Sequence, residues 1–422
     1  ASIDRQVAQN RSLIKNLGYF LQEEVLTAGE KLLLTAGIRA DQSSLDADAK
    51  KLFWYPKLSA SYRVVKPASF LDEIKFRGAF GASGNEPEYG QRFSPLFATA
   101  NIGGSPGLVV GGIRGAADLR PERQKEFEGG FDAYFWGNTA NLEFTVYQKN
   151  ISDLLLPRTL APSTGFTTEV ANGGKLRTRG VEIAAAVQPV QSRDFTWLSR
   201  ATFFSNRSKV TELPVPTFLS TAGGFGVAIG AFQIEQGQSP TQIVGNDTLA
   251  NGSIVVRKQG DANPDFRMSF TNDVTYKAFG LHFLLDWQKG SNILNLTKLL
   301  SDLASTTADY ADPIPGSTQT VGQKRLAGFT KKTSNYIESA SFLKLREVTL
   351  SYDLPTSAVR RLWRGARHAR LSLSGRNLFT SSPYSGLDPE VSNFGNQAIV
   401  RNIDVGPYPP SRSFWFAVDL GF

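Results

Sequence analysis

Histidine is scarce in this chain, so few residues could carry acid–base chemistry. His282 and His368 are the only two among 422 residues. His282 shares a predicted strand face with Asp286, but four residues along a strand separate the two side chains by roughly 13 Å, too far for a hydrogen-bonded dyad. A Ser-His-Asp hydrolase needs all three groups within hydrogen-bond reach, and the sequence nominates no serine. We therefore predict that the protein is not an enzyme.

Loop carboxylates are the other groups that could hold a ligand, here a calcium ion. Asp302, Asp309 and Asp312 lie in one predicted loop, and Asp261 and Asp265 lie near the end of another. Neither set has the regular ligand spacing of a calcium loop, so we expect solvated loop acids and no metal site. Cysteine is absent, which agrees with an oxidising compartment. No cofactor is predicted.

The basic charge, +8 with a pI of about 9.5, raises the question of nucleic acid. Lysine and arginine alternate with apolar residues along the chain instead of forming a basic helix. The densest cluster contains Arg360, Arg361, Arg364, Arg367 and Arg370. We expect these cations to line a rim facing water or lipid headgroups, and no nucleic-acid partner.

The elements that must position these residues are β-strands, because apolar and polar side chains alternate repeatedly. Alternation places successive side chains on opposite faces of a strand. The clearest apolar faces comprise Phe127, Gly129, Phe131, Ala133 and Phe135; Leu142, Phe144 and Val146; Phe266, Met268, Phe270 and Val274; Leu281, Phe283, Leu285 and Trp287; and Phe414, Phe416, Val418, Leu420 and Phe422.

A soluble β-sandwich would show the same alternation, but two features favour a membrane barrel. The predicted strands reach about ten residues or more, as membrane strands do, whereas globular strands usually have about five or six. Their polar faces also carry ordinary charges, as a water-filled lumen would. No run approaches the roughly 20 apolar residues of a membrane-spanning helix. The predicted fold class is all-β, an antiparallel transmembrane β-barrel.

Connector lengths alternate between short and long. Short ones lie at residues 66–71, 137–139, 189–194, 278–280 and 354–367, and long ones at 83–121, 151–174, 210–262, 291–340 and 380–411. Outer-membrane barrels have short periplasmic turns and long extracellular loops, so the rhythm is the expected one. We count about thirteen strands, the first near residues 11–25. Because single-chain bacterial barrels have even numbers of strands, the count predicts part of a larger barrel.

Two local departures from the alternation predict specific features. In residues 342–352 the apolar phase changes between Leu345 and Val348, so we expect a β-bulge near Arg346 and Glu347. In the loop after Trp287, leucines at helical spacing predict a short external helix.

Several ordered motifs resemble the SusC/RagA branch of TonB-dependent outer-membrane transporters. They are YPKLS at 55–59, GASGN at 81–85, RGVEI at 179–183, FLKLREVTLSY at 342–352, LSGRNL at 373–378, PYSGLDPE at 383–390 and the chain end from 410 to 422. The resemblance implies a 22-stranded barrel in the outer membrane of a Gram-negative bacterium, filled by a plug. It also implies energy from TonB–ExbB–ExbD, a SusD-like surface lipoprotein, and contact with lipid and lipopolysaccharide. Residues 1–422 would be the C-terminal portion of the barrel, with the plug and first strands outside this chain.

The resemblance and the aromatic residues suggest two sets of functional positions. Phe414, Phe416, Val418, Leu420 and Phe422 look like the C-terminal signal read by the barrel-insertion machinery. The external Tyr310, Tyr336 and Tyr384 are candidates for stacking on sugars. The implied function is TonB-dependent uptake of bulky glycans or oligopeptides. The alternative is a structural barrel that scaffolds a surface assembly without TonB coupling.

Overall fold

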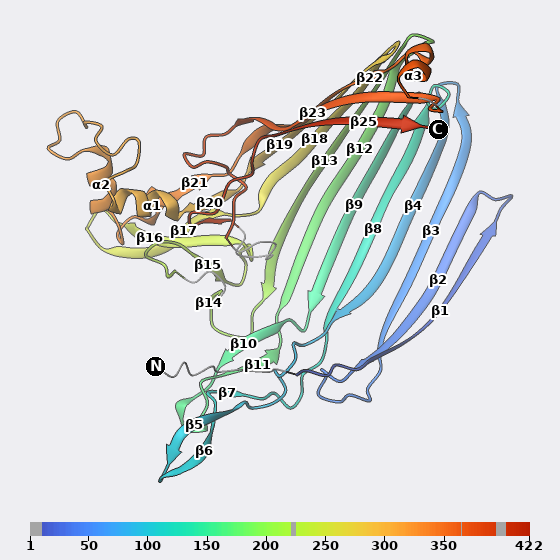
Figure 1. The fold of residues 1–422 in the computed structure, drawn as a ribbon. Coiled ribbons are helices and arrows are strands. Elements are labelled where there is room, and N and C mark those ends of the chain that lie inside the picture. Colours follow the sequence, from blue (N-terminus) through green and yellow to red (C-terminus); the bar gives the residue numbers. More distant parts are fainter. Residues whose placement is uncertain (1–10, 221–224, 364, 394–401) are drawn as a thin grey trace.

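The protein is built on one antiparallel sheet of thirteen strands, which we describe from a computed structural model covering residues 11–220, 225–363, 365–393 and 402–422. Figure 1 shows these strands curving together as a wall, with α3 and the C-terminus at one end. Every strand pairs with the next wall strand along the chain. The thirteen are β1 (Asn16–Thr27), β2 (Leu32–Ser43), β3 (Phe53–Ala68), β4 (Leu71–Asn85), β8 (Glu122–Phe135), β9 (Ala140–Ser152), β12 (Lys175–Gln191), β13 (Phe195–Glu212), β18 (Pro264–Tyr276), β19 (Phe279–Gly290), β22 (Phe342–Asp353), β23 (His368–Ser381) and β25 (Ser413–Gly421).

This sheet confirms the predicted fold class, the strand count and the alternation of connector lengths. The β18–β19 connection is only residues 277–278, and β8 joins β9 through residues 136–139. In the latter turn Trp136, Gly137 and Asn138 all adopt positive φ, which lets the chain reverse within a few residues. The 354–367 connector contains α3 (Thr356–Leu362). None of the helices in the described part of the chain is long and apolar enough to cross a bilayer.

The register gives the sheet one apolar and one polar face. Directly paired positions form an apolar row across eight strands, Phe76, Phe131, Phe144, Ile183, Phe203, Met268, Trp287 and Leu343. The rings of Phe131 and Phe144 lie 5.5 Å apart. One residue along, the opposite face carries Lys75, Asp132, Glu143, Ala184, Thr202, Ser269, Asp286 and Lys344 in the same order of strands. We call this second face the lumenal face.

The predicted bulge lies in β22. Pairing with β19 and with β23 shifts between Leu345 and Glu347, leaving Arg346 as the extra residue. Because one added residue reverses the side-chain phase, Leu345 and Val348 both stay on the apolar face. The bulge prediction is confirmed.

The long connectors contain the remaining strands and helices. The strands are β5 (Leu96–Ile102), β6 (Ser105–Val110), β7 (Ile113–Arg114), β10 (Leu155–Thr159), β11 (Thr168–Asn172), β14 (Phe218–Leu219), β15 (Ala231–Ile234), β16 (Gln242–Thr248), β17 (Ile254–Asp261), β20 (Asn292–Asn295), β21 (Ile337–Ser339) and β24 (Ile403–Asp404). The helices are α1 (Leu296–Leu303), α2 (Val321–Ala327), and the 3₁₀ turns η1 (Pro162–Thr164) and η2 (Thr333–Tyr336). The helix predicted after Trp287 is α1.

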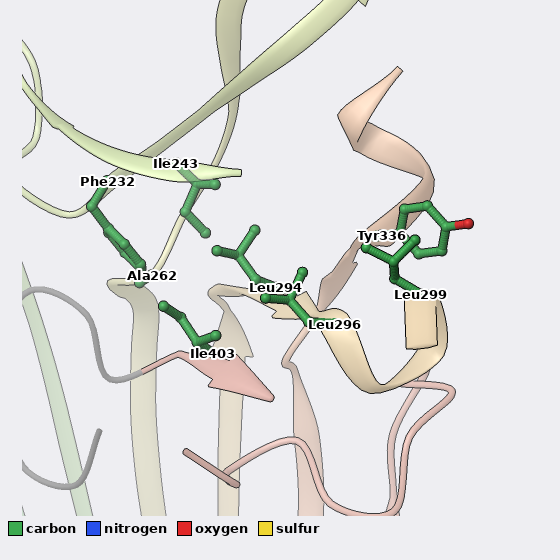
Figure 2. Close-up of a cluster of buried hydrophobic side chains, with 8 residues drawn as sticks. All are labelled: Phe232, Ile243, Ala262, Leu294, Leu296, Leu299, Tyr336 and Ile403. Carbon is green, nitrogen blue, oxygen red and sulfur yellow. The ribbon is translucent and has the colours of Figure 1, made fainter. Parts of the chain in front are cut away.

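The largest buried apolar cluster in the described part of the chain lies among these connectors and not in the wall. Its members come from three connectors, as Figure 2 shows, and are Phe232, Ile243, Ala262, Leu294, Leu296, Leu299, Tyr336 and Ile403. Asn295 caps α1 by accepting a hydrogen bond from the Lys298 backbone N–H at 2.9 Å. From this helix Leu296 and Leu299 pack into the cluster. We call β14–β17, β20, β21, β24, α1, α2 and η2 the outer loop module.

Candidate functional site

The lumenal face is crosslinked by ion pairs between neighbouring strands. Asp132 on β8 accepts hydrogen bonds from Lys75 (2.7 Å) and Arg77 (3.1 Å) on β4. Arg77 also donates to Thr145 on β9 at 2.6 Å, so one guanidinium joins three strands. Such paired charges keep the face wettable and hold its side chains in fixed positions.

A denser charge cluster lies where β18, β19 and β22 approach the outer loop module. Asp286 on β19 accepts hydrogen bonds from Arg267 (2.5 Å) on β18 and Arg346 (2.6 Å) on β22. Lys344 donates to Asp388 and to Glu390, both at 2.7 Å. We call these six residues the rim cluster.

Phe342 forms the apolar floor of the rim cluster. Its side chain is 2% exposed, and the cationic groups of Lys344, Arg346 and Arg267 lie 5.0, 5.3 and 5.9 Å from its ring centroid. Because the ring face is electron-rich, it attracts cations held this close. Three cations and three carboxylates thus meet around one aromatic ring.

The rim cluster fastens residues 382–393 onto the wall. Asp388 and Glu390 belong to that segment, whereas their cationic partners are wall residues. The same segment is held at its start, where Ser382 donates to the Ser341 carbonyl at 2.7 Å. Further on, Ser385 donates through its backbone N–H to Glu338, also at 2.7 Å. The arrangement can hold an outer segment against the lumenal entrance.

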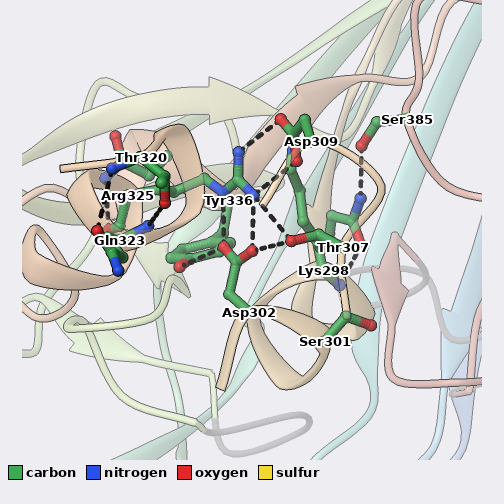
Figure 3. Close-up of polar contacts among 12 residues, drawn as sticks. Lys298, Ser301, Asp302, Thr307, Asp309, Thr320, Gln323, Arg325, Tyr336 and Ser385 are labelled. Atoms are coloured by element: carbon green, nitrogen blue, oxygen red, sulfur yellow. Dashed lines mark hydrogen bonds and ion pairs between the residues drawn. The ribbon is translucent and has the colours of Figure 1, made fainter. Parts of the chain in front are cut away.

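A second polar centre lies inside the outer loop module. Asp302 on α1 is fully buried and accepts hydrogen bonds from Arg325 (2.5 Å) and the Tyr336 hydroxyl (3.0 Å), as Figure 3 shows. Arg325 also donates to Asp309 at 2.8 Å. Burial alone would raise the pKa of Asp302, but the hydrogen bonds from Arg325, Thr307 and Tyr336 outweigh it and lower that pKa. Burial and the Asp302 carboxylate raise the pKa of Tyr336.

These positions correct two expectations from the sequence. Asp302 is a buried ion-pair partner and not a solvated loop acid. Tyr336 and Tyr384 are 1% and 7% exposed, and the Tyr384 hydroxyl donates to Asp404, so neither ring offers a face to a sugar. An external loop would leave such rings accessible to a sugar. Here the connectors pack into buried apolar clusters that include Tyr336 and Tyr384. Tyr310 is partly exposed beside α2 and keeps its candidacy.

The histidines have carboxylate partners from neighbouring strands. His282 Nδ1 lies 2.7 Å from Asp273 Oδ1, and His368 Nε2 lies 3.1 Å from Asp353 Oδ1. Asp286, which shares the face of His282, is bound instead by arginines. Among the described residues, no group of three or more histidines or acids converges as a metal site would require.

The residues predicted as an assembly signal lie mostly exposed on or just after the last wall strand. Phe414, Phe416 and Val418 are exposed on one face of β25, and Phe422 follows the strand with 78% exposure. Leu420 differs, because it packs beside Val359 of α3 and Ala369 of β23. The rim cluster was not predicted, although four of its six residues lie in two of the motifs quoted above: Lys344 and Arg346 in FLKLREVTLSY, and Asp388 and Glu390 in PYSGLDPE.

Comparison with known proteins places this geometry in context. Residues 3–378 match the model of the family described as TonB dependent receptor-like, beta-barrel. TonB-dependent receptor P3 of Formosa agariphila is 28% identical over 93% of this chain and 44% of its own length. TonB-dependent receptor SusC of Bacteroides thetaiotaomicron is 23% identical over 93% of this chain and 42% of its own length. The chain therefore spans less than half the length of these relatives.

The fold is also similar to that of a solved transporter. The structure of the RagAB peptide importer in the closed-closed state matches with a TM-score of 0.78 at 19% identity, covering 96% of this chain and 48% of that one. These likenesses confirm the resemblance to SusC and RagA that the motifs indicated.

Proposed function

Because this chain belongs to the TonB-dependent receptor-like β-barrel family, we propose that it forms part of the wall of an outer-membrane importer for bulky nutrients, glycans or oligopeptides. Receptors of this family are not enzymes, which agrees with the scarcity of histidine. The observation that carries the proposal is the register, because it gives one uninterrupted sheet an apolar row and a largely polar row on opposite faces. An apolar face meets lipid and a polar face lines an aqueous lumen in membrane barrels.

We place the remainder of the barrel on strands outside the thirteen. Among the described residues, β1 and β25 each pair with one neighbour only, so both have an open edge. Open sheet edges are not tolerated in hydrocarbon, because their backbone N–H and C=O groups stay unpaired. Further strands between these edges, to a total of 22, would close the wall. A plug inside it would connect to TonB–ExbB–ExbD.

A partner at the outer surface is part of the same proposal. The outer loop module is a folded body with its own apolar core and buried ion pairs, unlike a set of unstructured loops. Such a surface suits a cap protein, and we propose a SusD-like lipoprotein in this place. The rim cluster would then tie the outer segment 382–393 to the lumenal entrance. Lipid and lipopolysaccharide would surround the apolar face.

The test is uptake by cells that carry or lack the gene. A deletion strain complemented with the full-length protein should regain growth on a complex glycan or peptide source, and loss of TonB should abolish the gain. Growth on the corresponding monomer is the control, since small solutes enter through porins. Complementation that is independent of TonB would exclude energised import. An unchanged growth rate together with loss of a surface assembly would favour the scaffold alternative.

A further inference from the structure

A pocket of about 480 Å³ opens on the outer loop module beside α2. The polar residues that line it come from four short segments and are Thr248, Lys324, Arg325, Lys331, Lys332 and Asn335. Four of these side chains are cationic, and no carboxylate is among the residues that line the pocket, so its lining is positively charged. Its volume falls within the range usual for small-molecule sites, about 300–1,000 Å³.

Three of the four cationic side chains have no carboxylate partner among the described residues. Arg325 is the exception, since Asp302 and Asp309 accept its hydrogen bonds. Lys324, Lys331 and Lys332 are exposed, and within the described part of the chain none of their ammonium groups forms an ion pair. Neighbouring like charges repel each other, which disfavours the compact state unless an anion approaches.

The backbone that carries these lysines is held in place. Asn246 donates to the Thr330 carbonyl at 2.6 Å and Thr248 to the Lys331 carbonyl at 3.0 Å, so β16 supports the turn at residues 328–332. Thr330 adopts a φ of 69°, a left-handed conformation that is unfavourable for a β-branched residue. The hydrogen bonds from β16 hold Thr330 in this strained conformation. Because the backbone of the turn is already ordered, less conformational entropy is lost when a ligand binds.

We propose that this pocket binds a carboxylated or sulfated oligosaccharide at the outer surface before it enters the barrel. The three unpaired lysines recognise its anionic groups. Thr248 Oγ1 donates to a carbonyl and keeps lone pairs that can accept from a sugar hydroxyl. An acidic peptide fits less well, because peptides are often captured along a free sheet edge, and β16 is paired on both sides by β15 and β17. The inference rests on the proposed function, which puts the module outside the cell.

Calorimetry on the purified full-length protein in detergent tests the pocket. The probes are oligogalacturonate, a sulfated carrageenan oligosaccharide, a neutral malto-oligosaccharide and oligoglutamate. For at least one acidic sugar we expect K324Q/K331Q/K332Q to raise Kd at least tenfold and to flatten its dependence on salt. The matched control K50Q/K51Q/K209Q removes three exposed lysines elsewhere and should leave Kd within twofold.

Four results of the calorimetry would overturn the assignment. These are an unchanged Kd in the pocket variant, an equal loss in the control, binding of the neutral sugar as tight as that of the acidic ones, and binding of oligoglutamate as tight as that of either acidic sugar. Lipopolysaccharide that copurifies with the wild type and is lost from the pocket variant would also overturn it, by assigning the lysines to membrane anions. Binding in detergent needs no energised import, so a failure of TonB-dependent uptake with binding intact would contradict the proposed function alone.

Discussion

Lys344 on β22 donates to both carboxylate oxygens of Asp388, 44 residues further along the chain, at 2.7 Å. The two side chains are only 4% and 12% exposed, so the pair is nearly dry. It joins the wall to the outer segment 382–393 at the point where the lumenal face begins. Removing one partner of a buried pair leaves an uncompensated charge, which is more harmful than removing both.

Lys344→Met should therefore destabilise the folded barrel by about 3–5 kcal/mol. Heat-modifiable migration in a denaturing gel gives the midpoint of unfolding. The double variant K344M/D388L should recover part of the loss, because no buried charge remains unpaired. Asp41→Asn breaks the exposed pair with Arg39, whose side chain is 64% exposed, and should cost about 0–1 kcal/mol. Equal shifts of the unfolding midpoint in Lys344→Met and Asp41→Asn would contradict a stabilising role for the buried Lys344–Asp388 pair.

The faces of β9 give a second prediction, on membrane insertion. Phe144 lies in the apolar row, and Glu143 beside it points to the lumenal face. Phe144→Lys should cost about 2–4 kcal/mol near the bilayer midplane, while Glu143→Lys should be mild. Folding into lipid vesicles across a urea series measures both. Similar losses for the two variants would count against the assignment of the faces.

Asp46, in the loop after β2, gives a pH prediction. It is 1% exposed, and neither carboxylate oxygen has a hydrogen-bond partner within the described residues. Burial, with a contribution from Glu86, raises the pKa of Asp46 to about 6 despite the opposing charges of Arg92 and Lys51. Because the folded state holds the proton more tightly than the unfolded chain, the free energy of unfolding should fall as pH rises from about 4 to about 6.

Asp46→Asn removes this titration. The difference in unfolding midpoint between variant and wild type should grow through that pH window in favour of the variant and then stay level. The exposed neighbour Asp48 supplies the control as Asp48→Asn. A difference that does not vary with pH would show that Asp46 is already charged throughout the window.

The C-terminal phenylalanine gives a prediction on assembly. Phe422 is 78% exposed and follows the last strand, so its removal takes away no core packing. If it belongs to the signal for barrel insertion, deleting Phe422 should lower the amount of folded protein in the outer membrane several-fold at unchanged synthesis. Tyr408→Ala, at a residue that is 93% exposed, is the matched control. Folding of purified protein into lipid should be unaffected, which separates a signal from a stability effect.

The sequence by itself determined the wall of this protein. Alternation with period two is a local property, so it gave the strands, their number and the bulge at Arg346 without knowledge of what each strand meets. The spacing of Leu296 and Leu299 likewise predicted α1, because helical periodicity is also local.

Only the tertiary structure decided which charges and rings meet. Arg325 and Asp302 lie 23 residues apart, and Lys344 and Glu390 lie 46 residues apart, with no periodic pattern connecting them. Tyr336 and Tyr384 looked external because a loop has no regular pattern that predicts burial, yet distant connectors fold together over them. Long-range packing of irregular segments leaves no signal in local spacing, and the rim cluster and the lysine pocket both depend on it.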